Sequence, residues 1–246
     1  MNDPFQMQPE LRYGAPVCDQ ILTNRFFSIG YSWHHRQAKW TLEIISQESM
    51  MVHDLPEVER KDYFRADLRV PRRFRAGLGA YEGSGFDRGH LVASADKDLL
   101  HIQNSETFLL SNMSPQVPSF NRGVWKRLEK AVRTLDQDPD IFETYVLTAP
   151  VFYFGKIIET IGDDSDASGI DIPIPHAFVK SVLTENKRGQ LSLWTFKLDN
   201  QALDGDLEDY LVVTYDAEQL IGGRFWDRVA GGDLHDQKKS KGRFWS

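Results

Sequence analysis

Short stretches of the chain alternate hydrophobic with polar residues, and this two-residue period is typical of β-strands. The first two stretches flank four polar residues at 34–37, so we expect them to pair as a hairpin. The chain is therefore expected to be rich in β-structure. The predicted strands lie at residues 25–33, 40–45, 86–92, 107–110, 145–153, 177–183 and 191–198.

A second period, of three to four residues, predicts an amphipathic helix at 120–135. The segment before this helix contains Pro115 and Pro118, which argue against regular structure there. Residues 207–220 fit either a strand at 210–215 or a helix that starts near residue 216. The apolar residues of the predicted helix are Val124, Trp125, Leu128, Val132 and Leu135.

The composition is that of a globular protein with a substantial core. The 246 residues are 41% hydrophobic and 26% charged, which excludes a disordered or collagen-like chain and fits one domain over residues 1–246. The single cysteine, Cys18, excludes an intramolecular disulfide and a zinc site built from thiolates. No apolar run is long enough to span a membrane, and no secretory signal is recognisable. We therefore expect no membrane contact and a protein that is cytoplasmic or exported by a signal-independent route.

The charge distribution bears on the partner that the protein binds. A net charge of −7 argues against a polyanion, because phosphate binding depends on clustered cations. However, residues 60–75 contain seven cations against Asp62 and Asp67, and residues 122–133 contain five against Glu129. This asymmetry is expected of a protein with one side facing a polyanion, and an ordinary solvated surface explains it equally well.

Asp87-Arg88-Gly89-His90 is the first candidate for catalytic chemistry. Histidine is the side chain best suited to accept a proton near neutral pH. In an extended segment Arg88 points to the same side as His90, where its guanidinium can bind a phosphate. The alternative is a structural histidine beside an Arg–Asp surface pair, and these four residues do not decide between the two.

Asn121, at the start of the predicted helix, is the second candidate. Taken singly, Asn121 is expected to be an N-cap and Glu129 an exposed partner of Lys126 or Arg133. Taken together, an amide oxygen and a nearby carboxylate on a basic helix suit a magnesium ion, which keeps most of its waters. Eight residues of helix rise by about 12 Å, which favours Asn121 as the direct ligand and Glu129 as an acceptor that orients water around the ion.

An ordered series of motifs links these candidates, mainly between about residues 60 and 133. In this order and spacing they resemble the sugar-non-specific DNA/RNA endonucleases of the ββα-metal type, the family that includes the endonuclease G group. The Val92-Ala93 pair departs from the Ala-Pro that is commoner there, which we interpret as a packing variation. The motifs are Gly83-Ser84-Gly85-Phe86-Asp87-Arg88-Gly89-His90-Leu91, Ser94-Ala95-Asp96, Thr107-Phe108-Leu109-Leu110-Ser111-Asn112-Met113-Ser114-Pro115-Gln116, Phe120-Asn121, Trp125, Leu128 and Glu129.

The resemblance implies a magnesium-dependent endonuclease that hydrolyses phosphodiester bonds in DNA and RNA without preference for sequence or sugar. His90 matches the general base that activates water, and Asn121 matches the direct magnesium ligand. Glu129 matches the carboxylate that orients the water around the ion. Manganese or another divalent ion is expected to be able to substitute for magnesium.

Four arginines complete the site that the resemblance implies. Arg88 matches the arginine that shapes the site, while Arg60 and Arg133 match the cations that meet the scissile phosphate and its developing charge. Arg122 is expected to contact the substrate as well. Contacts confined to phosphates carry no base information, so such a site is expected to cut any sequence and to be inhibited by salt.

The fold expected from the resemblance is α+β, with a central, mainly antiparallel sheet flanked by helices. The site is expected in a ββα finger within about residues 85–135, formed by 85–92, 107–110 and 121–135. DNA and RNA are the expected partners, and a homodimer or a dedicated inhibitor protein is compatible with the family. A nucleic-acid-binding relative without activity is the alternative, although every residue assigned above is present. A serine hydrolase is excluded because the chain has no Gly-x-Ser-x-Gly motif.

Overall fold

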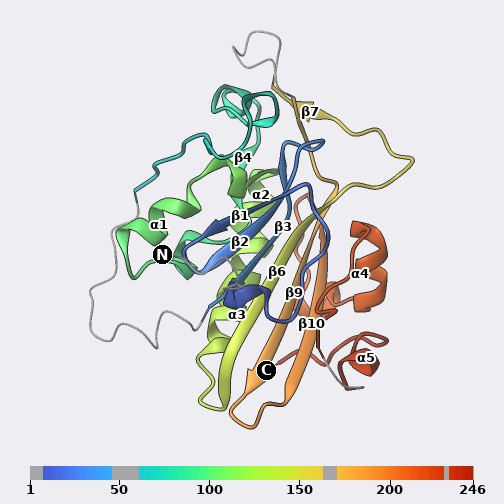
Figure 1. Cartoon of the computed structure of the whole chain (residues 1–246). Helices are drawn as coiled ribbons and strands as arrows, with labels where there is room; N and C mark the ends of the chain where they lie inside the picture. Colours follow the sequence, from blue (N-terminus) through green and yellow to red (C-terminus); the bar gives the residue numbers. More distant parts are fainter. Residues whose placement is uncertain (1–7, 46–60, 163–170, 230–232, 246) are drawn as a thin grey trace.

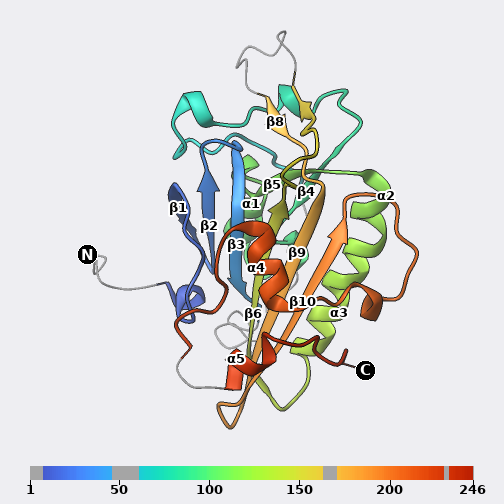
Figure 2. The same ribbon diagram turned by 90° about the vertical axis from the view of Figure 1, so that its right-hand side faces the viewer.

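The computed structural model describes residues 8–45, 61–162, 171–229 and 233–245. Within these residues the main feature is a six-stranded antiparallel sheet, whose strand order can be followed from β1 to β10 in Figure 2. The α+β fold with a central antiparallel sheet is therefore confirmed. In spatial order the strands are β1 (Gln20–Asn24), β2 (Phe27–Ser32), β3 (Gln37–Ile44), β6 (Ile141–Val151), β9 (Ala177–Asn186) and β10 (Leu191–Asp199).

Both faces of the sheet are buried, because successive residues of a strand point to opposite faces. In β6, for example, Tyr145 enters one core and Val146 the other. The Tyr145 side is covered by α4 (Thr214–Ile221) and α5 (Asp233–Gln237), and the Val146 side by α3 (Lys126–Asp136). Figure 1 shows α3 and α4 on opposite sides of the sheet. The sheet is thus the middle layer between two layers of helices.

The ββα finger lies on the α3 side of the sheet. Its two strands, β4 (Asp87–His90) and β5 (Met113–Gln116), pair in antiparallel fashion. The chain then forms one short turn of helix, α2 (Pro118–Phe120), and a π-helical turn at Asn121–Trp125 before α3 begins. The predicted amphipathic helix is confirmed, with its apolar residues buried against the sheet.

The prediction of the second finger strand was wrong. Residues 107–110 are not a strand, because α1 (His101–Thr107) occupies the start of this segment. The strand lies a few residues later, in β5, and it includes Pro115. A proline lacks the N–H that a central strand needs, but within the described chain β5 pairs only with β4, so one of its edges requires no donor.

Smaller elements complete the described chain. The strand alternative at 210–215 was wrong, since residues 207–210 form a short 3-10 turn and α4 starts at Thr214. Strand β1 was not predicted from the sequence. No helix in the described ranges is both long and apolar enough to cross a lipid bilayer. The remaining elements are β7 (Thr160–Ile161), β8 (Ile172–Pro173) and 3-10 turns at Pro9–Leu11, Arg72–Phe74, Gly79–Tyr81, Ser94–Asp96 and Leu110–Asn112.

Candidate active site

A cavity of about 420 Å³ lies between the finger and the segment around Phe64. The finger strand β4, the π-helical turn and α3 each contribute two of the residues that the sequence singled out. The structure therefore brings together six of the seven predicted site residues, and the seventh, Arg60, lies outside the described residues. The six are Arg88, His90, Asn121, Arg122, Glu129 and Arg133.

The pairing of β4 with β5 puts Arg88 and His90 on the same side of the strand. Between them, Gly89 lies opposite Ser114, and a Cβ atom there would come within 2.2 Å of the Gln116 side chain. Glycine at this position therefore leaves room for the buried Gln116 side chain. Since residues two positions apart in a strand share a face, Arg88 and His90 both reach the cavity.

Two aromatic rings restrain these side chains. The imidazole ring of His90 meets the Phe108 ring edge to face at a centroid distance of 4.9 Å, and the Phe64 ring lies 5.8 Å away. The Arg88 guanidinium lies over the Phe64 ring at 4.4 Å, a cation–π contact. We assigned no function to Phe64 from the sequence, because nothing local in its segment indicates that it packs against β4.

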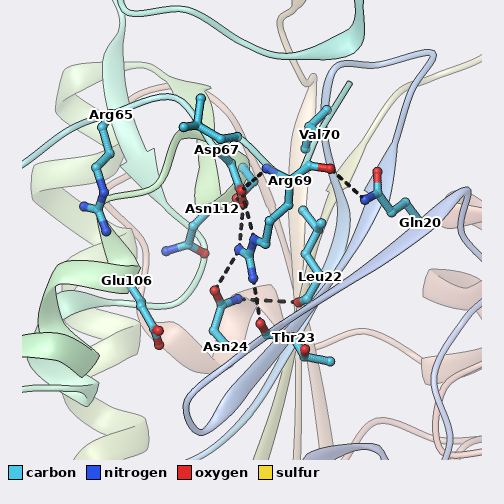
Figure 3. Close-up of polar contacts among 12 residues, drawn as sticks. Gln20, Leu22, Thr23, Asn24, Arg65, Asp67, Arg69, Val70, Glu106 and Asn112 are labelled. Atoms are coloured by element: carbon cyan, nitrogen blue, oxygen red, sulfur yellow. Dashed lines mark hydrogen bonds and ion pairs between the residues drawn. The ribbon is translucent and has the colours of Figure 1, made fainter. Parts of the chain in front are cut away.

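The segment that carries Phe64 is fixed by an ion pair between the buried Asp67 and the exposed Arg69 (Figure 3). The Asp67 carboxylate accepts hydrogen bonds from Arg69 Nε at 2.9 Å and Arg69 Nη2 at 2.7 Å, and from Ser111 Oγ at 2.7 Å. Arg69 Nη1 also donates to the Thr23 carbonyl at the end of β1, at 2.6 Å. These contacts bind the segment to the sheet edge on one side and to the chain before β5 on the other.

Asp67 is consequently held in its charged form. Burial alone would raise the pKa of this carboxyl group, but the hydrogen bonds from Arg69 and Ser111 outweigh burial and hold its pKa below the usual value. The neighbouring Arg65 binds a different part of the chain, because its Nη1 donates to the Ser105 carbonyl at 2.8 Å. Arg65 does not line the cavity.

Asn121 is oriented by the first residue of β4. Its Nδ2 donates to Asp87 Oδ2 at 2.9 Å, so the amide oxygen is the end of the side chain that is left for a cation. The N-cap interpretation of Asn121 was wrong, because the first helical residue is Pro118 and Asn121 opens the π-helical turn. Gly123 has non-helical dihedral angles inside this turn, with φ −100° and ψ −110°. The kink changes the direction of the helix between Asn121 and α3.

Asp87 also binds Arg122, whose Nε and Nη2 lie 2.9 and 2.6 Å from the two carboxylate oxygens. Burial would raise the pKa of Asp87, but the hydrogen bonds from Arg122 and Asn121 hold it below the usual value. Asp87 is therefore held in its charged form, and it fixes the side chains of both Asn121 and Arg122. The sequence indicated its motif but not this function, which depends on a contact between β4 and the π-helical turn.

Glu129 and Arg133 reach the cavity from successive turns of α3. Arg133 is held by Asp96, whose Oδ1 lies 2.5 Å from Arg133 Nη1. Among the described residues neither Lys126 nor Arg133 forms an ion pair with Glu129, so the surface-pair interpretation of this carboxylate was wrong. Burial raises the pKa of Glu129 to about 7, and the nearby Lys180 opposes this shift.

A buried ion pair lies beneath these residues. Lys97 Nζ is 3.1 Å from Glu43 Oε2 on β3, and both side chains are fully shielded from solvent. Lys97 directly follows Asp96, the residue that holds Arg133. Removing one member of such a pair leaves an uncompensated charge, so the pair fixes the turn that carries Asp96 to the sheet.

The donor atoms around the cavity fit a hard divalent cation such as magnesium. Within the described ranges there is no group of three or more His, Cys, Asp or Glu side chains that could hold a metal ion. A transition-metal cage is therefore not formed by these residues. One amide oxygen from Asn121 and a carboxylate from Glu129, which both border the cavity, make up the sparse oxygen set that magnesium tolerates because it retains much of its hydration.

The chain is similar to known nucleases over most of its length. A profile of the DNA/RNA non-specific endonuclease family matches residues 9–231. Nuclease C1 of Cunninghamella echinulata var. echinulata is 32% identical, over 92% of this chain and 90% of its own. Mitochondrial endonuclease G of Homo sapiens is also 32% identical, over 86% of this chain and 71% of its own. A solved structure of the EndoG/EndoGI complex, which concerns EndoG inhibition, contains a chain that superposes with a TM-score of 0.80 at 29% identity and covers 90% of this chain and 91% of that one.

Proposed function

Given that the chain belongs to the DNA/RNA non-specific endonuclease family, and is thus a nuclease that hydrolyses nucleic acids, we propose that it is a magnesium-dependent endonuclease for both DNA and RNA. The observation that carries this proposal is the meeting of His90 and Asn121 at one cavity that also contains three arginines. A base, an oxygen ligand for a cation and several phosphate-binding groups are what the hydrolysis of a phosphodiester requires.

His90 acts as the general base in this mechanism. The imidazole accepts a proton from the attacking water, which it can do only when it is neutral, so the rate falls in acid. Phe108 and Phe64 keep the ring in place through the contacts described above. A ring that is already oriented loses little entropy when water and phosphate arrive.

Asn121 would hold the divalent ion through its amide oxygen, and Glu129 would accept hydrogen bonds from the water around the ion. When bound, the ion supplies positive charge to the phosphate and to the departing 3′ oxygen. Asn121 is a neutral ligand and leaves the full charge of the ion available for this purpose. Magnesium is the proposed ion, and manganese or another divalent ion is able to replace it at a site made of oxygen donors.

The arginines bind the phosphate backbone. Arg88 shapes the site beside His90, Arg122 contacts the substrate, and Arg133 meets the developing negative charge. Arg60 is proposed for the same function as Arg133. Because phosphates and not base edges are bound, neither the sequence nor the sugar of the nucleic acid is read.

We further propose that residues 1–246 form one catalytic domain. By analogy with the EndoG/EndoGI complex, a dedicated inhibitor protein is a reasonable partner, and a homodimer is compatible with the fold. Several relatives are named as mitochondrial nucleases, so an organelle is a candidate location beside the cytoplasm and signal-independent export.

The proposal is tested by incubating the purified protein with supercoiled plasmid and, separately, with total RNA, each in magnesium and in EDTA. We expect both substrates to be degraded in magnesium and neither in EDTA. Binding without cleavage under all conditions would instead support a nucleic-acid-binding relative with a silent site. Cleavage of one substrate only would contradict the lack of sugar preference.

A further inference from the structure

Four cationic side chains line the cavity, and three of them are held by the protein itself. Arg122 is bound by Asp87, Arg133 is bound by Asp96, and Arg88 lies on the Phe64 ring. The fourth is Lys126, which has an exposed side chain. In the part of the chain that the structure describes, no carboxylate lies within ion-pair distance of it.

Lys126 is the first residue of α3, immediately after the kinked π-helical turn. One turn of helix before it is Arg122 and one turn after it is Glu129, and all three side chains border the same cavity. The kink at Gly123 therefore brings the start of α3 to the edge of the site. Lys126 is exposed to solvent and borders the same cavity as Asn121 and Glu129.

The simplest alternative is that Lys126 is an ordinary solvated lysine. Its neighbours on α3 provide the comparison. Arg127 donates to the Gly205 carbonyl at 2.8 Å and thus joins α3 to a loop. Lys130 is exposed, lies one turn further along the same helix and does not line the cavity. If solvation explained both lysines, they would contribute equally to nucleic-acid binding.

We propose that Lys126 contacts a backbone phosphate next to the scissile phosphate, and so fixes the register of the strand in the cavity. This inference rests on the proposed nuclease function. A lysine is a flexible point charge with three donors, so it is able to follow a phosphate without requiring one geometry. The three held cations, by contrast, have fixed positions suited to the phosphate that reacts. Since every nucleic acid carries phosphates, Lys126 serves DNA and RNA alike.

The test measures binding without turnover. In the His90→Ala background we would replace Lys126 by Met and, as a matched control, Lys130 by Met. Fluorescence anisotropy with a labelled DNA duplex and a labelled RNA, between about 50 and 200 mM salt, gives the slope of log Kd against log salt. We expect the Lys126→Met slope to be smaller in magnitude by about 0.9 on duplex DNA, the contribution of one phosphate contact, and to weaken RNA binding as well. Lys130→Met should keep the parent slope, and Lys126→Arg should retain it because the charge is preserved.

Three results would overturn the inference: an unchanged slope in Lys126→Met, an equal loss in both lysine variants, or a loss in the Lys126→Arg variant as large as in Lys126→Met. The melting temperatures of the variants should match that of the parent, since both lysines are exposed. Binding is read separately from cleavage, so a protein that binds but never cuts would contradict the proposed function without deciding on Lys126.

Discussion

Asn121 donates its side-chain N–H to Asp87 across 2.9 Å, and this contact determines which end of the amide is left for a cation. Without it the amide group is free to rotate and to present its N–H₂ end instead. We therefore expect Asp87→Ala to raise the magnesium concentration needed for half-maximal activity by about 10- to 100-fold, the usual cost of losing a partner of a metal ligand. Magnesium titration of plasmid cleavage measures this shift.

Asp87→Asn is the matched control for that experiment, because its amide oxygen is still able to accept the hydrogen bond from Asn121. Its magnesium requirement should lie between those of the parent and Asp87→Ala. An Asp87→Ala enzyme with the parent's magnesium dependence would show that Asn121 needs no help to present its oxygen.

Replacing the proposed ligand itself should have the larger effect. In Asn121→Ala the amide oxygen is absent, so we expect both the apparent magnesium affinity and the maximal rate to fall, the affinity by more than about 100-fold. Asn121→Asp keeps an oxygen at the same position and should recover part of the affinity. An unchanged magnesium requirement in Asn121→Ala would refute the ligand assignment.

Asp96 should act on the rate through Arg133. The carboxylate holds the guanidinium at 2.5 Å, and Asp96→Asn removes the charge that fixes it. We expect the turnover number to fall by about tenfold or more, because misplacing a charge-stabilising group is costly, while binding of DNA changes less. Single-turnover cleavage with saturating enzyme separates the two effects. Glu82→Gln, which neutralises an exposed carboxylate outside the cavity, should leave the rate unchanged.

The Asp67–Arg69 pair should make the stability depend on pH in acid (Figure 3). The folded-state pKa of Asp67 lies below the ordinary value of 3.8, so its stabilising contribution is present above about pH 4 and is lost as the pH falls through the folded-state pKa. We expect Asp67→Asn to lower the free energy of unfolding by about 2 kcal/mol at pH 7, with a smaller difference from the parent in acid. Urea unfolding at several pH values tests this; a difference that stays constant down to pH 2 would contradict it.

The sequence predicted the parts of the fold that depend on local patterns, and it missed parts that depend on contacts between residues far apart in the chain. Strand β10 was found because apolar and polar residues alternate along it, and this pattern is visible locally in the sequence. Strand β5 was missed because Pro115 and Pro118 argue against regular structure in this segment, and because its polar residues are buried only through distant partners. Ser114, for example, donates to the Gln37 side chain at 2.6 Å. The residues next to Ser114 in the sequence give no indication that Gln37 is its partner.

The same limit applies to the site. His90 and Asn121 lie in motifs with recognisable order and spacing, so both could be named before the structure was known. The positions of Phe64 against Arg88, and of Asp96 against Arg133, depend on segments that are far apart in the chain. Sequence reasoning therefore identified the groups that we propose to carry the chemistry, but not the groups that hold them in place.

The central claim is that His90 is the base that activates water, and it is tested most directly by the single-turnover cleavage rate of His90→Ala at saturating magnesium. We expect that rate to fall by about 10² to 10⁴ while DNA binding, the magnesium requirement and the melting temperature stay close to those of the parent. Added imidazole should restore part of the rate. A His90→Ala enzyme that cleaves at the parent's rate would contradict the mechanism.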